Sequence, residues 1–187
     1  KNISLKKVTA PEGCLVPTGF ATNAGIVELE NNEFAFGIHQ SEAWEDGYLL
    51  FDYELNPNGK YKLSFDTRVH NYKTPISIGS TYAPNSTAGF TDSRKIELEE
   101  PSSAGKFTHV EYEFNGSSLY GVVGENTAKY FAFKLYSYGG AGNPANILVK
   151  NVKITNITPA DYSAVEEATA KAVALRPDAD LYVNFQA

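Results

Sequence analysis

The 187-residue sequence has one cysteine, no methionine and no long apolar run. Because a lone thiol cannot form an internal disulfide, packing must hold the fold together, and we expect Cys14 to be buried and inert. No apolar run approaches the roughly 20 residues of a membrane span, so we expect no membrane insertion. Basic residues are also few, because 16 lysines and arginines against 22 acidic residues give a net charge of −6. This charge argues against nucleic acid as a partner.

Short alternating runs separated by turn residues fill the chain from residue 24 to residue 157. This pattern is typical of an antiparallel sandwich or barrel, and runs with a helical period are missing there. The sequence therefore predicts an all-β domain. Its predicted strands lie near residues 33–40, 47–55, 60–70, 75–82, 94–99, 106–114, 129–138 and 146–156.

The sequence pattern changes at Thr158. The segment TPADYSAVEEATAKAVAL predicts a helix capped by Thr158, or alternatively by Asp161, that ends before Pro177. Glu167 and Lys171 are spaced to pair on its polar side. We therefore expect two units, a β-sandwich over residues 1–157 and a helical appendage over residues 158–187. An isolated helix of about 15 residues is marginal in water, so we favour a bundle whose other helices are missing.

Two predicted strands carry polar or aromatic side chains on the face opposite the core. In residues 60–70 the core face begins with Tyr61, Leu63 and Phe65, and in residues 129–138 it is Phe131, Phe133 and Leu135. The side chains of the opposite faces include Asp66, Arg68, His70, Lys134, Tyr136 and Tyr138. If the two strands are neighbours in one sheet, these groups stand side by side. Rings beside hydrogen-bonding groups suit a sugar.

Two further aromatic residues, Trp44 and Tyr72, lie in predicted loops and are candidates for a site at the rim of the sandwich. Trp44 is either a plug at the end of the sandwich or a stacking platform. Tyrosines and alternating charges are also ordinary on a solvated strand face, so an exposed face without a ligand remains an alternative. His39 and His109 have no partners at metal-ligand spacing and are interpreted as surface histidines.

Enzyme motifs are missing from the sequence. It contains no HExxH, no GxSxG and no phosphate-binding loop. Acidic residues recur at alternating positions, which is ordinary for a solvated strand, although a glycosidase also needs two carboxylates. These residues are Glu97, Glu99, Glu100, Glu111 and Glu113. We therefore predict no catalytic residues, and a glycosidase or lyase is the weaker alternative.

The stretches DYELNPNGKYKLSFDTRV, FTHVEYEF, YFAFKLYSY and NILVKNVKITNI resemble the jelly-roll carbohydrate-binding modules of bacterial polysaccharide-degrading enzymes. The resemblance covers roughly residues 20 to 157. It implies a two-sheet antiparallel β-sandwich (jelly roll), a polysaccharide or glycan as partner, and a place in a larger glycan-active enzyme. Many such modules hold a structural calcium with an aspartate where this chain has Lys150. The resemblance therefore leaves open whether this chain binds calcium, and no other cofactor is expected.

The tail, DYSAVEEATAKAVAL followed by DLYVNF, resembles the start of a FIVAR repeat, a helical spacer of secreted or wall-attached proteins of Gram-positive bacteria. This resemblance implies that the chain is a fragment of a long modular protein with covalently linked neighbouring domains. We expect that parent to be secreted or attached to the cell wall.

Together these patterns predict a non-catalytic module that binds a polysaccharide or glycan by aromatic stacking and polar contacts. The module would target a larger secreted or surface protein. A structural or adhesive spacer without glycan specificity is the main alternative. The site is expected either on an open sheet or at the loop rim. Its candidate ligand-binding residues are Trp44, Asp66, Arg68, His70, Tyr72, Tyr136 and Tyr138.

Overall fold

The computed structural model describes most of the chain, in two compact units, Lys1–Ile157 and Thr158–Ala187. The described residues are 9–21, 23–30, 33–40, 47–69, 75–90, 94–96, 98, 106–119, 122–123, 126–135 and 145–174.

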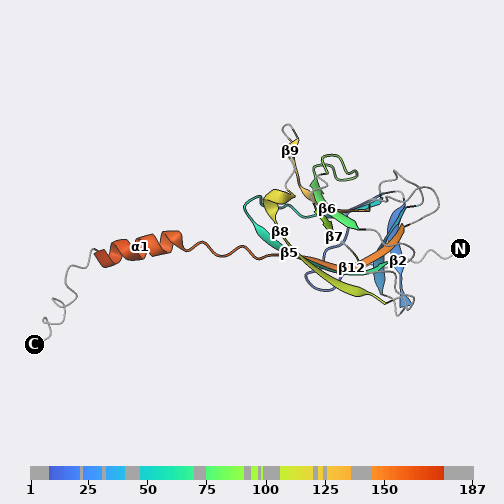
Figure 1. Cartoon of the computed structure of the whole chain (residues 1–187), viewed down its shortest axis with the longest axis horizontal. Coiled ribbons are helices and arrows are strands. Elements are labelled where there is room, and N and C mark those ends of the chain that lie inside the picture. Colours follow the sequence, from blue (N-terminus) through green and yellow to red (C-terminus); the bar gives the residue numbers. More distant parts are fainter. Residues whose placement is uncertain are drawn as a thin grey trace, which may run out of the picture. The chain divides into compact units, whose positions relative to one another are not determined.

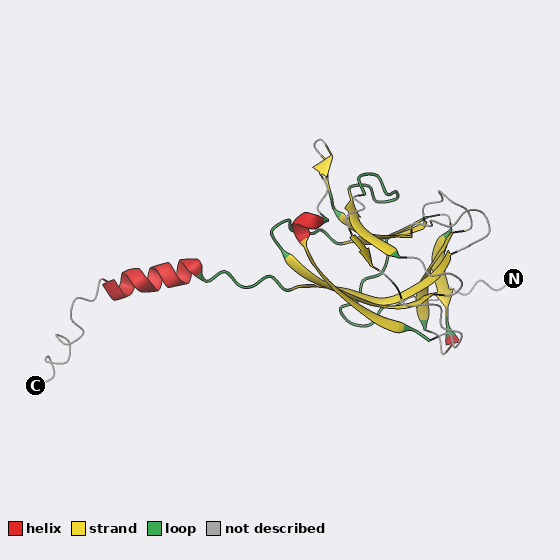
Figure 2. Ribbon diagram, in the orientation of Figure 1, coloured by secondary structure: helices red, strands yellow, loops and turns green. Residues whose placement is uncertain are grey.

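The first unit is a sandwich of two five-stranded antiparallel sheets (Figures 1 and 2). The first sheet, here called sheet A, has the order β1 (Gly19–Phe20), β4 (Gly47–Asp52), β11 (Tyr130–Leu135), β6 (Ile76–Thr81) and β7 (Arg94–Ile96). The second sheet, sheet B, has the order β2 (Ala24–Glu28), β3 (Phe34–Gln40), β12 (Ala145–Asn156), β5 (Lys60–Val69) and β8 (Thr108–Asn115). A short hairpin, β9 (Val122–Val123) and β10 (Asn126–Thr127), and a 3₁₀ turn, η2 (Gly116–Ser118), complete this unit's described elements. The predicted two-sheet β-sandwich with a C-terminal helix is confirmed.

The core lies between the sheets and follows the predicted alternation. In β5 all five residues of the predicted core face are buried, from Tyr61 to Val69. In β11 Phe131, Phe133 and Leu135 are fully buried. The two sheets meet through aromatic rings, because the Phe65 ring of sheet B lies 5.0 Å, centroid to centroid, from the Phe133 ring of sheet A.

The strands around residues 60–70 and 129–138 are not neighbours in one sheet, so the condition under which their outer side chains would stand side by side is not met. β5 pairs with β12 and β8, whereas β11 pairs with β4 and β6. Alternation determines which side chains of a strand share a face, but it does not determine which strands pair. Asp66 and Arg68 therefore lie on the outer face of sheet B, and Lys134 lies on the outer face of sheet A.

The turn before β5 is held by Tyr61. Its phenol oxygen accepts a hydrogen bond of 2.8 Å from the Asn56 backbone N–H, and the Gly59 N–H bonds to the Asn56 carbonyl. Gly116 lies against the same turn, and a Cβ at this position would stand 1.9 Å from the Asn56 carbonyl oxygen. Only glycine therefore fits where the η2 turn meets this loop.

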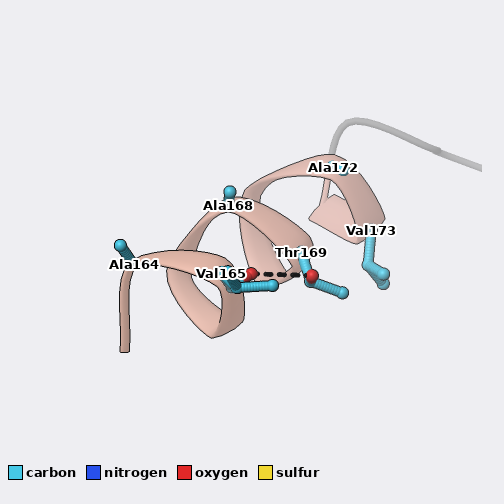
Figure 3. Close-up of a pocket in the computed structure, with 6 residues that line it drawn as sticks. All are labelled: Ala164, Val165, Ala168, Thr169, Ala172 and Val173. Carbon is cyan, nitrogen blue, oxygen red and sulfur yellow. Dashed lines mark hydrogen bonds between the residues drawn. The ribbon is translucent and has the colours of Figure 1, made fainter. Parts of the chain in front are cut away.

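The second unit contains one described helix, α1 (Ser163–Ala174). It begins later than Thr158, and Asp161 accepts a hydrogen bond from the Ser163 N–H at its start. The predicted Glu167–Lys171 pair forms, at 2.7 Å. One face of α1 carries small and apolar side chains, and none of the helix's residues is buried (Figure 3). No helix in the described residues is long and apolar enough to cross a membrane.

Truncating Phe133 tests whether the inter-sheet rings stabilise the sandwich. We expect Phe133→Ala to lower the free energy of unfolding by about 3–5 kcal/mol, because it removes a fully buried ring and leaves a cavity. Urea denaturation followed by tryptophan fluorescence would measure it. Tyr162→Ala is the matched control, because its ring is 63% exposed and its loss should change stability by less than about 0.5 kcal/mol. Equal effects of the two variants would contradict this account of the core.

Candidate functional site

Two of the seven predicted ligand-binding residues, Asp66 and Arg68, belong to the described residues. Both are half-buried on the outer face of β5. The other predicted residues lie outside the described residues, in three segments of the chain, 41–46, 70–74 and 136–144. These residues are Trp44, His70, Tyr72, Tyr136 and Tyr138.

The described strand ends next to these three segments lie together. In sheet A, Gly47 and Ile76 are both register partners of Leu135, so the ends of β4, β6 and β11 form one row. In sheet B, β3 and β12 end as partners at Gln40 and Ala145, and the end of β5 is paired with β12 nearby. Each segment connects one of these sheet B ends to one of these sheet A ends. The five undescribed candidates thus fall in chain segments attached to one end of the sandwich, here called the Gly47 end.

A row of polar side chains crosses the outer face of sheet A next to the Gly47 end. Tyr48 and Ser77 are both register partners of Lys134. The Tyr48 phenol donates a 2.7 Å hydrogen bond to the Asn85 carbonyl, and the Lys134 ammonium lies 5.4 Å from the centroid of the Phe90 ring. The loop at residues 82–90 therefore lies against this face.

The residues predicted from the sequence did not include two of these, Tyr48 and Phe90. The alternation of GYLLFD places Tyr48 opposite the core residues Leu49 and Phe51, so a period-two pattern was enough to find it. Phe90 had no comparable signal. It reaches the site because its loop crosses the sheet, and strand periodicity carries no information about the path of a loop.

Asp66 is engaged within the protein, on the outer face of sheet B. Its carboxylate accepts a 2.7 Å hydrogen bond from the Asn151 amide and lies 2.7 Å from His109 Nδ1. Asn151 has a positive φ of 55° at the point where the β12–β5 register shifts. Asp66 thus stabilises the irregular part of β12.

A ladder of cross-strand ion pairs continues along β5 and β8. Lys62 lies 2.7 Å from Glu111, and Lys60 lies 2.9 Å from Glu113. The hydrogen bond from Lys62 lowers the pKa of Glu111, and the charges of Lys62 and His109 lower it further. These carboxylates are exposed and paired with lysines, which is the arrangement of a solvated sheet surface.

Arg68 and Lys150 lie beside the ring of Phe107. The Arg68 guanidinium carbon lies 5.4 Å from the ring centroid and the Lys150 ammonium 4.6 Å, a distance suited to cation–π attraction. Lys150 also pairs with Glu33 at 2.7 Å. Among the described residues, no group of three or more histidine, cysteine, aspartate or glutamate side chains is placed to hold a metal ion.

No family model and no curated protein matches the chain, but solved structures do. A structure described as "CBM4 structure and function" is 14% identical, with a TM-score of 0.51 over 78% of this chain and 96% of that chain. The CBM22-1 xylan-binding domain of Paenibacillus barcinonensis Xyn10C is 8% identical, with a TM-score of 0.45 over 82% of this chain and 92% of that chain. The N-terminal cellulose-binding domain of Cellulomonas fimi β-1,4-glucanase C is 11% identical, with a TM-score of 0.46 over 81% of this chain and 100% of that chain. The first of these shows that the chain shares the β-sandwich fold of that structure.

The structural role of Asp66 predicts a measurable cost when its carboxylate is removed. We expect Asp66→Ala to destabilise the sandwich by about 1–3 kcal/mol, because Asn151 and His109 both lose a bonding partner. Glu113→Ala is the matched control and should cost at most about 1 kcal/mol, because its ion pair is exposed. Chemical denaturation would measure both. An Asp66→Ala protein as stable as the control would show that Asp66 does not hold β12.

The lowered pKa of Glu111 predicts a pH-dependent contribution to stability. Because the folded-state pKa of Glu111 lies below the ordinary value of 4.5, its ionised carboxylate stabilises the fold at pH values above 4.5. This contribution is lost as the pH falls through the folded-state pKa. The stability difference between the unmodified protein and Glu111→Gln should therefore be present at neutral pH and vanish in acid. Denaturation midpoints measured from about pH 7 to about pH 3 would show this, and a difference that persists in acid would contradict the ion-pair explanation.

Proposed function

We propose that the sandwich is a non-catalytic glycan-binding module that attaches a larger secreted or surface protein to a polysaccharide or glycan. The observation that carries this proposal is the clustering of strand ends at the Gly47 end. The segments attached there contain Trp44, Tyr72, Tyr136 and Tyr138. Rings that gather at one end of a domain offer more stacking surface than rings scattered singly, which is why we assign the site to these four aromatic residues.

The binding mechanism is stacking combined with hydrogen bonding. The C–H face of a sugar ring packs on an aromatic ring, and its hydroxyls bond to the polar groups beside it. Lys134 and Tyr48 lie in the row next to the Gly47 end and supply an ammonium and a phenol. Asp66 and Arg68 face outward from the opposite sheet, so we assign them no part in this site.

The similarity in fold to the CBM4 structure supports the proposal only by analogy, since one fold hosts many functions. The paired state of Glu111 and Glu113 also supports a role without catalysis. A glycosidase needs an acid and a second carboxylate flanking the scissile bond, whereas these two carboxylates pair with lysines on an exposed sheet.

We also propose that residues 158–187 begin a FIVAR-like helical spacer of a modular, wall-attached or secreted parent protein. α1 supports this proposal, because its apolar side chains Val165 and Val173 are more than 60% exposed. An amphipathic helix of 12 residues gains little stability until such a face is covered. Further helices of the same bundle would cover it.

A glycan array and pull-downs with insoluble polysaccharides would test the function. We expect a specific hit whose affinity falls at least about tenfold in Trp44→Ala or Tyr136→Ala, because a stacked ring and its buried area are lost. Tyr130→Ala is the control on the same strand, because Tyr130 lies at the other end of β11 from Leu135. It should bind as well as the unmodified protein.

Two results would contradict the proposal. A broad panel without any hit would favour the spacer without glycan specificity. A hit that is unchanged in both Trp44→Ala and Tyr136→Ala would place binding elsewhere on the sandwich.

A further inference from the structure

We propose that β2 is a contact surface between two copies of this chain, which pair along their β2 strands around a two-fold axis at Ile26. Sheet B of one copy would then continue into sheet B of the other. The contact involves the free edge of β2, so the proposal does not depend on glycan binding at the Gly47 end.

The described strands give the sandwich four sheet edges, and three of these are protected against pairing. Sheet A ends in β1 and β7, which are two and three residues long. Sheet B ends on one side in β8, whose outward residues Glu111 and Glu113 are charged and ion-paired with lysines of β5. Short strands and charged side chains are common means of preventing edge-to-edge association. β2, at the other side of sheet B, has five residues, and its one charged residue, Glu28, is the last.

The backbone of β2 directs the polar groups of Ile26 towards this edge. The His39 N–H of β3 donates to the Asn23 carbonyl at 3.0 Å, and the Leu29 N–H donates to the Glu33 carbonyl at 2.7 Å. Alternate residues of an antiparallel strand bond to the same neighbour. Ile26 lies three residues from both Asn23 and Leu29, so its N–H and C=O point away from β3. No other described strand lies on that side, and these two groups are placed to bond to a further strand.

The side chains at this edge are apolar and exposed. In the described part of the sandwich three large apolar side chains are exposed, and two of them, Ile26 and Val27, are neighbours on β2. The exposed fraction is 51% for Ile26 and 37% for Val27. Exposed apolar residues that occur singly are ordinary, whereas adjacent ones on the edge strand of a sheet favour association.

The order of residues in β2 fits a second copy of the same strand. When two copies pair around an axis at Ile26, each Ile26 lies opposite the other, and Val27 of each copy lies opposite Gly25 of the other. A Cβ at Gly25 would meet no atom within 4 Å, so the space beside this glycine can take the valine methyl groups. Opposed residues without mutual hydrogen bonds stand closest, with Cα atoms about 4.5 Å apart. The valine therefore packs on the glycine backbone at two places related by the axis.

The charges at this edge are compatible with a second copy as the partner. In the two-fold register Glu28 lies opposite Ala24 of the other copy, so no two like charges face each other. The two Glu28 residues are four positions apart, or about 13 Å along the strands. A contact of this kind is isologous, in which one surface is complementary to itself.

The dimer is expected to be weak and reversible. A pair of five-residue strands is smaller than a stable interface, which buries at least about 1,200 Å². The net charge of −6 on each copy also opposes association. We therefore expect the dimer only at high protein concentration, and we expect added salt to strengthen it by screening this repulsion.

Sedimentation velocity of the full chain, from about 10 µM to about 1 mM, would measure the association. Ile26→Lys should weaken it at least about tenfold, because it places two ammonium groups opposite each other and removes an apolar contact. Its melting temperature should stay unchanged, since Ile26 is half exposed in one copy. Val165→Lys is the matched control on α1, where Val165 is 61% exposed, and it should associate as the unmodified protein does.

Disulfide cross-linking would test the register. In a Cys14→Ser background, which removes the chain's own thiol, Ile26→Cys should form a disulfide-linked dimer on mild oxidation. Directly opposed, hydrogen-bonded residues have Cα atoms about 5.5 Å apart, which suits a disulfide. Glu28→Cys is the control and should not cross-link, because a separation of about 13 Å is too long.

The proposal is overturned if the full chain stays monomeric up to about 1 mM or if Ile26→Lys associates as well as the unmodified protein. It is also overturned if Glu28→Cys cross-links as readily as Ile26→Cys. Association that is lost in Val165→Lys but kept in Ile26→Lys would place the contact on α1 instead. None of these measurements involves a glycan, so their failure is distinct from a failure of the proposed function.

Discussion

The packing of aromatic rings between the two sheets is the interaction on which the rest of this structure depends. Phe65 contacts Phe133, and Phe133 in turn lies 5.5 Å from Phe51 and 5.4 Å from Phe131. With no disulfide available, this ring cluster and the aliphatic residues around it must offset the conformational entropy lost on folding. Because the rings occupy the inner faces of both sheets, the polar residues of β5 and β11 are directed to opposite outer faces.

This separation divides the candidate binding surface into two. On the sheet A side, Lys134 and Tyr48 lie next to the strand ends from which the ring-bearing segments leave. On the sheet B side, Arg68 lies beside Phe107 and in the same row as the paired glycines of β2 and β3. A single ligand residue cannot contact both faces, since the full thickness of the core lies between them. The two candidate surfaces are therefore separate, and a ligand proposed for one of them need not suit the other.

The sequence predicted the parts of the fold that depend on local periodicity. The core face of β5 and the Glu167–Lys171 pair follow directly from period-two and helical spacing. The pairing of strands did not follow, because it depends on contacts between distant segments and two amphipathic strands have no local mark of their partner. The same limit applied to the site. Asp66 and Arg68 were correctly placed on an outer face. The residues that contact them, Asn151, His109 and Phe107, were not predicted.

The glycine row shows a signal that periodicity overlooks. In AGIVE and FAFGIHQ, Gly25 and Gly37 are weak strand formers at outward positions, and taken singly each is unremarkable. Their significance depends on register, which makes them partners and places them in line with Leu148 and Arg68. The side chains of Val27 and Leu148 cover Gly37, whereas a Cβ at Gly25 would meet no atom within 4 Å. This open space depends on the position of Gly25 in the edge strand, and only the assembled sheet reveals it.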